Sequence, residues 1–468
     1  MIKYIFPKFV KEANGIEGLE NLLLKQELQI GLNEKHIALF NAGSSIVLDF
    51  GKEIRGGIRI LSSDVKDLKY AKIRIRFGES LAECYSNIGE NNATNDHSPR
   101  DIYGTLSSWS DTCFGDTGFR FVRIDLLSEE RIYIKSIVAK SYERNDEPRY
   151  VYDGNDTLIK DIYDAAKRTI DLCSVGKYVY DGIKRDRLVW VGDMYPEMLA
   201  LTTLYGRSSN LERSLDFAKK QYPIPEIMYG MPTYSLWWVS IVSDYYAKTK
   251  NEQFIKKQLK YLNEQLKLFD SRIEETGKLN INNYFVDWPT VNHKDEYIGA
   301  ICIAIIAYKS GINLLKQFDY DVSSFEKTLQ NLYKNDFTNI KQKQVIGLKY
   351  FALGSIGEED YNNLIDDRAK GFSTFMSYFI LKAIASRDEH LAIELMKDYY
   401  GAMLKLGATT FFEDFNLDWI DEYSSIETIS NTNDFHKDHG AFCYQGLRHS
   451  LCHGWASGVL TFMEEHIK

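Results

Sequence analysis

The stretch IGAICIAIIAY, residues 298–308, is apolar on every side of a helix, whereas FIKKQLKYLNEQLKLF, residues 254–269, is apolar along one face only. A helix that is apolar all round belongs in the interior of a protein, and an amphipathic helix covers that interior. Stretches of these two kinds alternate from about residue 155 onward. The alternation predicts inner and outer layers of paired helices, and their number fits an (α/α)6 barrel.

The first of these helices begins near residue 155. Asn155 or Asp156 can cap it, and apolar residues recur at helical spacing after them. Further helices are predicted at 193–206, 210–221, 234–249, 252–276, 294–316, 322–335, 371–386, 388–406 and 446–466.

Residues 45–145 have a different period. Segments at 45–50, 57–61, 71–77, 119–127 and 132–138 alternate apolar with polar residues, and turn-forming residues separate them. This pattern predicts an antiparallel, jelly-roll-like β-sandwich. We therefore predict a β-sandwich accessory domain over 1–148 and a barrel domain over 149–468. The polar stretch 79–116, with NNATNDHSPRD inside it, is expected to be a long functional or mobile loop.

The composition excludes several classes of function. A net charge of −9 over 468 residues argues against nucleic acid or an anionic membrane as the main partner. The chain starts without the apolar run of a secretion signal and contains no run of about 18 apolar residues, so a cytoplasmic protein without a membrane span is expected. Its six scattered cysteines form no CxxC pair, which predicts free, buried thiols and no zinc. A homodimer is left open as the assembly.

The stretch DGIKRDRLVWVGD, residues 181–193, combines six charged residues with a tryptophan and several aliphatic residues. A solvated loop has little use for the apolar side chains, and a core segment cannot bury so many unpaired charges. A partly buried polar site is the remaining interpretation. The segments 224–238, 283–297 and 407–423 also mix aromatic residues with carboxylates or turn residues, and an aromatic content of 13% suits a carbohydrate cleft.

Carboxylates beside aromatic rings, without a phosphate-binding or metal-binding motif, point to acid–base chemistry on a polar substrate that can stack on rings. Glycoside hydrolysis needs little more than two carboxyl groups, one protonated and one ionised. Asp181, Asp186 and Asp193 can couple so that one of them keeps its proton, and Arg185 and Arg187 can set which one stays charged.

Three motifs resemble those of the α-L-rhamnosidases of glycoside hydrolase family 78. DGIKRDRLVWVGD is similar to the family signature D-C/G-x-x-R-[ED]-[RK]-L-x-W-x-G-D, GATTFFE (407–413) to its GATT-x-[WF]-E segment, and SLCHGW (450–455) to its final histidine segment. GFRFV (118–122) resembles the end of the family's β-sandwich. The likeness covers roughly residues 45–468 and implies an inverting, exo-acting hydrolase that releases terminal α-L-rhamnose or a similar deoxy-sugar.

The resemblance also implies roles for individual residues. Asp186 would be the general acid and Glu413 the general base. Substrate contacts would come from Asp181, Arg185, Trp190, Asp193 and His453. Position 186 departs from the family, whose acid is most often Glu, one methylene longer than the Asp present here. No metal or organic cofactor is expected, and a carbohydrate is the expected partner.

Two further residues, Asp287 and Trp288, are placed at the subsite wall without support from a motif. Several of the chosen residues also have plain structural interpretations. The charges of 181–187 can brace a loop as ion pairs, Asp193 can start a helix, and Trp190 and His453 can belong to the core.

Two other functions stay open on the sequence. A polysaccharide lyase on the same barrel would use a tyrosine or histidine base, for which Tyr195, Tyr229, Tyr234 and Tyr297 are candidates. A non-catalytic sugar-binding protein would carry Asp186 as a degenerate acid.

Overall fold

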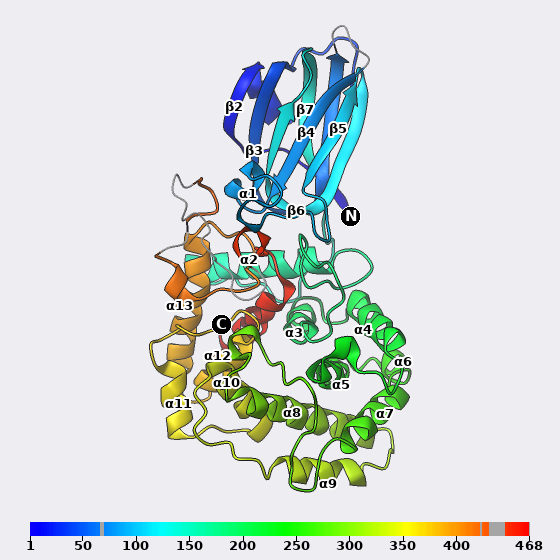
Figure 1. Ribbon diagram of the computed structural model, residues 1–468, viewed down its shortest axis with the longest axis vertical. Helices are drawn as coiled ribbons and strands as arrows, with labels where there is room; N and C mark the ends of the chain where they lie inside the picture. The colour runs from blue at the N-terminus through cyan, green and yellow to red at the C-terminus, as the bar shows by residue number, and fades with distance from the viewer. Residues whose placement is uncertain (66–69, 422–423, 430–444, 468) are drawn as a thin grey trace.

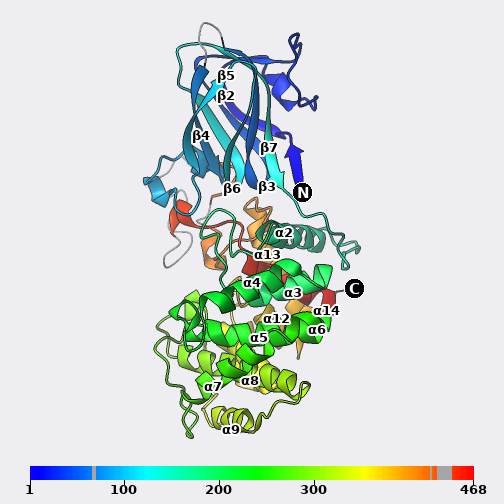
Figure 2. The ribbon, with the colours of Figure 1, turned by 90° about the vertical axis from the view of Figure 1, so that its right-hand side faces the viewer.

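The computed structural model describes residues 1–65, 70–421, 424–429 and 445–467. A β-sheet region, residues 2–142, lies at one end of the molecule, and a helical region, residues 157–466, forms the rest (Figure 1). Helix α2 (Thr157–Ser174) lies between the sheet and the other helices in two perpendicular views (Figures 1 and 2).

In the part of the β-sheet region that the structure describes, seven antiparallel strands pair in the order β1-β7-β3-β6-β4-β5, with β2 paired to β3. The strand β3 is 28 residues long, and both of its halves pair with β6 and with β7. The sheet therefore bends around one apolar core, to which Ile46, Ile60, Ile75, Phe119 and Val122 belong. The strands are β1 (Ile2–Ile5), β2 (Phe9–Glu17), β3 (Ala38–Val65), β4 (Tyr70–Gly78), β5 (Asp101–Ser107), β6 (Ser110–Leu126) and β7 (Ile132–Tyr142).

The five predicted strands all exist, and the antiparallel sheet is confirmed. The segments predicted at 45–50 and 57–61 are the two halves of β3. The prediction of one long loop over 79–116 is wrong, because this stretch contains a short helix, α1 (Leu81–Tyr85), the strand β5 and the first part of β6. The burial of β5 alternates, with 102, 104 and 106 on the inward face, but its sequence does not, because Tyr103 is exposed and Gly104 faces inward.

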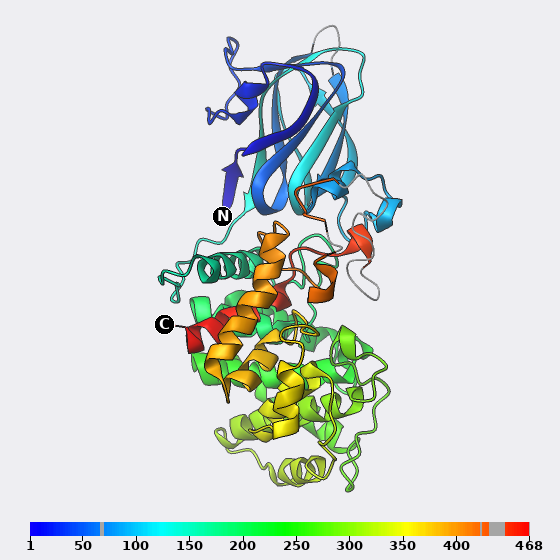
Figure 3. The same cartoon turned by 90° about the vertical axis from the view of Figure 1, so that its left-hand side faces the viewer.

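Helices that are buried on all sides alternate with amphipathic helices along the helical region, as predicted. The buried ones are α3 (Met194–Tyr205), α5 (Pro232–Thr249), α8 (Glu296–Lys316), α10 (Lys343–Leu353) and α12 (Ser377–Ala385). The amphipathic ones are α2, α4 (Ser209–Gln221), α7 (Leu259–Asp270), α9 (Ser323–Leu332), α11 (Glu358–Ile365) and α13 (Glu389–Lys405). Figure 3 shows α13 on the outside of the helical region, running up towards the sheet.

Helix α8 is, within the described residues, the one helix whose length and composition would allow it to cross a membrane. It is a core helix here, because 78% of its most apolar window is buried inside the protein.

Some helix boundaries differ from the prediction. The helix predicted at 252–276 is divided into α6 (Glu252–Ile255) and α7, and the one predicted at 446–466 is regular only in α14 (Val459–His466). The sequence analysis missed α10 and α11. Helix α10 carries Gly347 at its centre, where a side chain would collide with the backbone of Ile380, and such a glycine weakens the helical signal.

The cysteines are only partly as expected. Cys84, Cys173, Cys302 and Cys452 are free and buried, but Cys113 is exposed on an outward-facing position of β6. The prediction that all the thiols are buried is therefore wrong, and Cys443 lies outside the described residues.

Buried polar contacts join the sheet to the helical region. The Lys184 ammonium group lies 3.1 Å from Glu79 and 3.3 Å from Glu83, and all three side chains are buried. Glu79 also accepts a hydrogen bond of 2.6 Å from the backbone N–H of Leu451. These contacts attach two of the predicted site segments to the end of β4.

Candidate active site

The three motif segments are hydrogen-bonded to one another through their backbones. His453 pairs with Gly182 in an antiparallel bridge, and the N–H of Gly454 donates to the carbonyl of Asp181 at 2.6 Å. The N–H of His453 also donates to the Phe411 carbonyl at 3.0 Å, and the N–H of Glu413 donates to the Ser450 carbonyl at 3.0 Å. The segment 450–454 therefore lies between the other two and holds their side chains around one point.

The loop 181–188 closes on itself through Asp181. Its side chain accepts a hydrogen bond of 2.8 Å from the N–H of Leu188, and its own N–H donates to the Leu188 carbonyl at 3.2 Å. Gly182 is required at the turn, because a Cβ there would lie 2.7 Å from the Arg185 carbonyl oxygen. This tight loop buries Arg185 and places Asp186 at a pocket wall.

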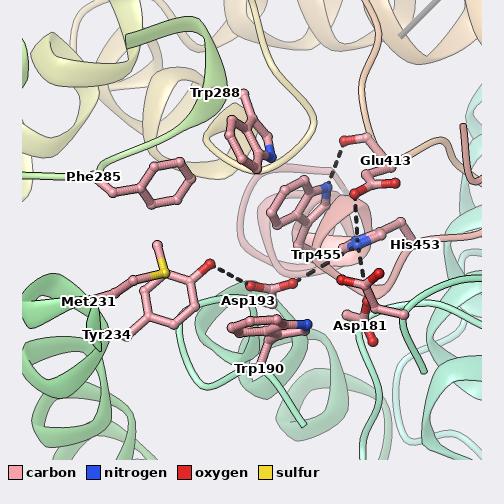
Figure 4. Close-up of a pocket in the computed structure, with 11 residues that line it drawn as sticks. Asp181, Trp190, Asp193, Met231, Tyr234, Phe285, Trp288, Glu413, His453 and Trp455 are labelled. Carbon is pink, nitrogen blue, oxygen red and sulfur yellow. Dashed lines mark hydrogen bonds and ion pairs between the residues drawn. The ribbon is translucent and has the colours of Figure 1, made fainter. Parts of the chain in front are cut away.

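A pocket of about 180 Å³ lies where these segments meet. Carboxylates and His453 form one side of it, and Met231, Phe285 and Trp288 form the other (Figure 4). The residues that line it are Asp181, Asp186, Trp190, Asp193, Met231, Tyr234, Phe285, Trp288, Glu413, His453 and Trp455. Seven of the nine residues chosen from the sequence are among them.

The two remaining residues, Arg185 and Asp287, lie behind the wall. Asp287 caps the short helix η4 (Trp288–Thr290), accepts a hydrogen bond from Ser373 and so fixes Trp288. Burial raises the pKa of Asp287 to about 7. It supports the wall through Trp288 and does not itself line the pocket.

Arg185 bridges the two carboxyl groups that the resemblance selects. Its Nη1 donates to Asp186 Oδ1 at 3.0 Å, its Nη2 donates to Glu413 Oε2, and its Nε donates to the Arg448 carbonyl at 3.1 Å. A planar guanidinium presents its donors in a fixed fork, so it can hold two carboxylates in a defined relation.

His453 faces three carboxyl groups. Its Nε2 lies 3.6 Å from Glu413 and 3.9 Å from each of Asp181 and Asp193 (Figure 4). Burial lowers the pKa of His453 well below its ordinary value, and the charge of Arg185 lowers it further. A neutral imidazole at this point can donate a hydrogen bond to a polar ligand or accept one from it.

Three of the carboxyl groups that line the pocket, Asp181, Asp193 and Glu413, are biased towards their protonated forms. Burial raises the pKa values of Asp181 and Asp193 well above the ordinary value. Burial also raises the pKa of Glu413, but Arg185 opposes this shift. Glu413 is therefore the buried carboxyl with a cationic partner that favours its ionised form.

Hydrogen bonds from neighbouring helices and loops fix the pocket walls. Tyr234, on α5, donates to Asp193 at 2.9 Å (Figure 4). The carbonyl of Glu413 accepts hydrogen bonds from Trp455 Nε1 at 2.8 Å and from Thr374 at 2.6 Å. The ring of Trp190 lies 4.7 Å from that of Tyr229 between centroids. The side chains that face the pocket are therefore fixed by hydrogen bonds and ring contacts with neighbouring elements.

Sequence reasoning missed Met231, Tyr234, Phe285 and Trp455 as wall residues. Two signals were present: 224–238 and 283–297 are rich in aromatic residues, and Trp455 follows His453 by two positions. Glu197 does not line the pocket. It is fully buried one helical turn after Asp193, and neither of its carboxyl oxygens has a hydrogen-bond partner within the described residues.

In the part of the chain that the structure describes, no group of three histidine, cysteine, aspartate or glutamate side chains could hold a metal ion.

Comparison with solved structures identifies the fold. The chain superimposes on a rhamnosidase from Klebsiella oxytoca with rhamnose bound, with a TM-score of 0.75 and 17% identity over 99% of this chain and 96% of that one. This chain has the rhamnosidase fold. The predicted resemblance to the α-L-rhamnosidases of glycoside hydrolase family 78 is confirmed at the level of the fold.

Two longer rhamnosidases match as well. A family 78 rhamnosidase of Bacillus sp. GL1 has a TM-score of 0.68 at 17% identity, over 96% of this chain and 48% of that one. The α-L-rhamnosidase from Aspergillus terreus has a TM-score of 0.66 at 16% identity, over 91% of this chain and 53% of that one. The chain thus spans about half the length of these two proteins. No family model matches the sequence, and a search of curated proteins finds no significant match.

Proposed function

We propose that this protein is an inverting, exo-acting glycoside hydrolase that releases terminal α-L-rhamnose, or a similar deoxy-sugar, from small glycosides or oligosaccharides. The observation that carries the proposal is the Arg185 bridge between Asp186 and Glu413 at the wall of a pocket, in a chain with the rhamnosidase fold.

In this mechanism Asp186 protonates the leaving oxygen while Glu413 removes a proton from the attacking water. The difference in burial supports this assignment, because the Asp186 side chain is 17% exposed and that of Glu413 is 2% exposed. The departing group of an exo-acting enzyme lies towards solvent, and the terminal sugar fills the closed end. Inversion requires carboxyl groups about 6.5–9.5 Å apart, which leaves room for the water between the sugar and the base.

The two sides of the pocket suit a deoxy-sugar. Asp181, Asp193 and His453 offer donors and acceptors to ring hydroxyls, and Trp190 offers a flat apolar face. Met231 and Phe285 would receive a methyl group, whereas a hydroxymethyl group there would lose hydrogen bonds to water. The pocket volume is below the roughly 300–1,000 Å³ typical of drug-sized ligands, which fits a single sugar residue.

We extend the proposal to the architecture. Buried and amphipathic helices alternate from α2 to α14, which supports an (α/α)6 barrel over 149–468 behind a β-sandwich over 1–148. We also place the protein in the cytoplasm, where short imported glycosides would be its substrates. The five described cysteines are free thiols, as a reducing compartment favours.

The contacts of the tyrosines weaken the case for a lyase. Of the four candidate bases, only Tyr234 lines the pocket, and its hydroxyl already donates to Asp193. Tyr195 is hydrogen-bonded to Asp244, away from the pocket. Arg185, the cation that would neutralise a uronate, is bound to two carboxylates of the protein itself.

A panel of aryl glycosides tests the proposal. We expect free sugar from the aryl α-L-rhamnoside, with the β-anomer formed first in a ¹H NMR time course. Initial formation of the α-anomer would disprove inversion. Binding of rhamnose without hydrolysis would identify a sugar-binding protein, and ultraviolet absorbance of an unsaturated uronate, formed from a uronate-containing polysaccharide, would identify a lyase.

A further inference from the structure

A loop of the β-sheet region reaches the candidate active site. It belongs to NNATNDHSPRD, residues 91–101, and three consecutive residues in it contact the site segments. Asp96 pairs with Arg448 at 3.4 Å, His97 Nε2 lies 3.3 Å from Asp186 Oδ1, and Ser98 donates to the Lys184 carbonyl at 2.9 Å. The loop therefore contacts Lys184 and Asp186, the two residues that flank Arg185 in the chain.

The position of His97 is imposed by its surroundings. Its φ of 64° lies in the left-handed region, which is strained for a non-glycine residue and persists only where neighbours hold it. Ser98, directly after it, is buried and hydrogen-bonded to Thr117 at 2.6 Å. Asn95 accepts hydrogen bonds from the backbone N–H groups of Arg100 and Asp101. These contacts fix the loop on both sides of His97.

Within the described residues, the nitrogen atoms of two side chains approach the same oxygen of the Asp186 carboxyl group. Arg185 Nη1 and His97 Nε2 approach Oδ1 at 3.0 and 3.3 Å. The second oxygen, Oδ2, is then the atom suited to carry a proton to a substrate. The other charges beside the loop are neutralised in pairs, Asp96 with Arg448 and Arg187 with Asp116.

We propose that His97 is a positioning residue for the general acid, which makes the β-sheet region part of the active site. This inference rests on the proposed function. When Asp186 Oδ2 gives its proton to the glycosidic oxygen, the bond from that oxygen to the sugar carbon breaks and Asp186 becomes a carboxylate. The N–H of His97 and the guanidinium of Arg185 then stabilise that charge through Oδ1. His97, which binds the Asp186 carboxyl group in addition to Arg185, also helps to fix the position of this short side chain.

The contact between His97 and Asp186 can be tested without measuring enzymatic activity. In NMR spectra of the full-length protein, the ring signals of His97, identified by their loss in His97→Ala, should shift on Asp186→Asn. Those of His390, which is 86% exposed and distant in the chain, should not. His97 signals that do not respond to Asp186→Asn would overturn the contact and the proposal with it.

Kinetics test the positioning role. The loss of a hydrogen bond to a charged group is expected to lower a reaction rate by roughly tenfold or more. His97→Ala should therefore slow an alkyl α-L-rhamnoside about tenfold and a nitrophenyl rhamnoside less than twofold, because only the alkyl alcohol needs a proton to leave. His97→Gln, whose amide can donate, should recover part of the loss and also serves if His97→Ala fails to fold. In the Asp186→Asn background His97→Ala should have no further effect.

A matched control comes from the same loop. Asp96→Ala breaks the pair with Arg448 and leaves His97 in place, so any loss of rate should be equal for both substrates. An equal loss on both substrates in His97→Ala, or an effect that adds to that of Asp186→Asn, would overturn the positioning role. A wild-type protein that hydrolyses no glycoside would overturn the proposed function and the acid role together, while the NMR result would still report whether the contact exists.

Discussion

Arg185 and Glu413, which are 228 residues apart in the chain, form an ion pair in which each side chain is 2% exposed. Burial raises the pKa of Glu413, and the guanidinium of Arg185 opposes that shift. The same guanidinium holds Asp186, so a single buried cation sets the relation between the two carboxyl groups. The loop 181–188 and the segment 407–413 are therefore joined by a buried ion pair.

Removing this cation should move the pH dependence of the proposed reaction. In Arg185→Met the pKa of Glu413 is expected to rise, because burial would act without opposition. A base works when it is ionised, so the acidic limb of the kcat/KM profile should shift to higher pH. Arg187→Met is the control, since Arg187 pairs with Asp116. An acidic limb at the wild-type pH in Arg185→Met would show that Glu413 is not the base.

Substitution of the two carboxyl groups should have different effects on different leaving groups. A general acid contributes about 10²–10⁴-fold in rate, and only where the leaving group needs a proton. Asp186→Asn should therefore slow an alkyl rhamnoside far more than a nitrophenyl rhamnoside, whereas Glu413→Gln should slow both alike. The two rates are measured for each variant. An equal loss on both substrates in Asp186→Asn would remove Asp186 from the acid role.

Lengthening the acid should reduce activity, although glutamate is the commoner residue in the family that the sequence resembles. In Asp186→Glu the carboxyl group moves by about 1 Å from the position set by Arg185 and His97, and misplacement of this size can cost about 10²-fold. The measurement is kcat/KM on an alkyl rhamnoside. A rate equal to or above that of the wild type would show that the site is not matched to aspartate.

The burial of Asp193 should make stability depend on pH. Its pKa in the folded protein is raised by burial, while an unfolded aspartate titrates near 3.9. The folded state then binds this proton more tightly, so the stabilising contribution is complete below about pH 4 and is lost as the pH rises through the folded value. Asp193→Asn, which can still accept from Tyr234, should have a wild-type Tm near pH 4 and a higher Tm at neutral pH. The exposed Asp161→Asn is the control and should show no such trend.

Gly454 should tolerate no side chain while Glu197 is present. A Cβ at position 454 would lie 1.8 Å from Glu197 Oε1, and Glu197 is fully buried. Gly454→Ala should therefore lower the free energy of unfolding by about 1–3 kcal/mol, as overpacked cores do. Glu197→Ala in the same chain should reduce this cost, which a double-mutant cycle of denaturant unfolding measures. Gly401→Ala, in α13 with 3.4 Å to Leu158, is the control and should be neutral or stabilising.

The sequence by itself determined the elements whose pattern lies within one short stretch. Helices such as α2 and α4 and strands such as β4 and β7 show their period through residues a few positions apart. The edge strand β5 does not, because Tyr103 on its exposed face and Gly104 on its inward face break the apolar–polar alternation. The helix α10 does not, because Gly347 at its centre weakens the helical signal. The three motifs likewise supplied six of the seven pocket residues that were predicted, since the spacing within each motif is local.

Only the tertiary structure decided how those segments meet. Backbone hydrogen bonds from 450–454 to two distant segments bring Asp186 and Glu413 to one pocket, and packing of α5 and η4 adds Tyr234 and Trp288 to its wall. The approach of His97 from the β-sheet region depends on how a whole sheet sits on the helices. Contacts between residues far apart in the chain are set by the burial of entire faces, and no local pattern of side chains encodes which faces will meet.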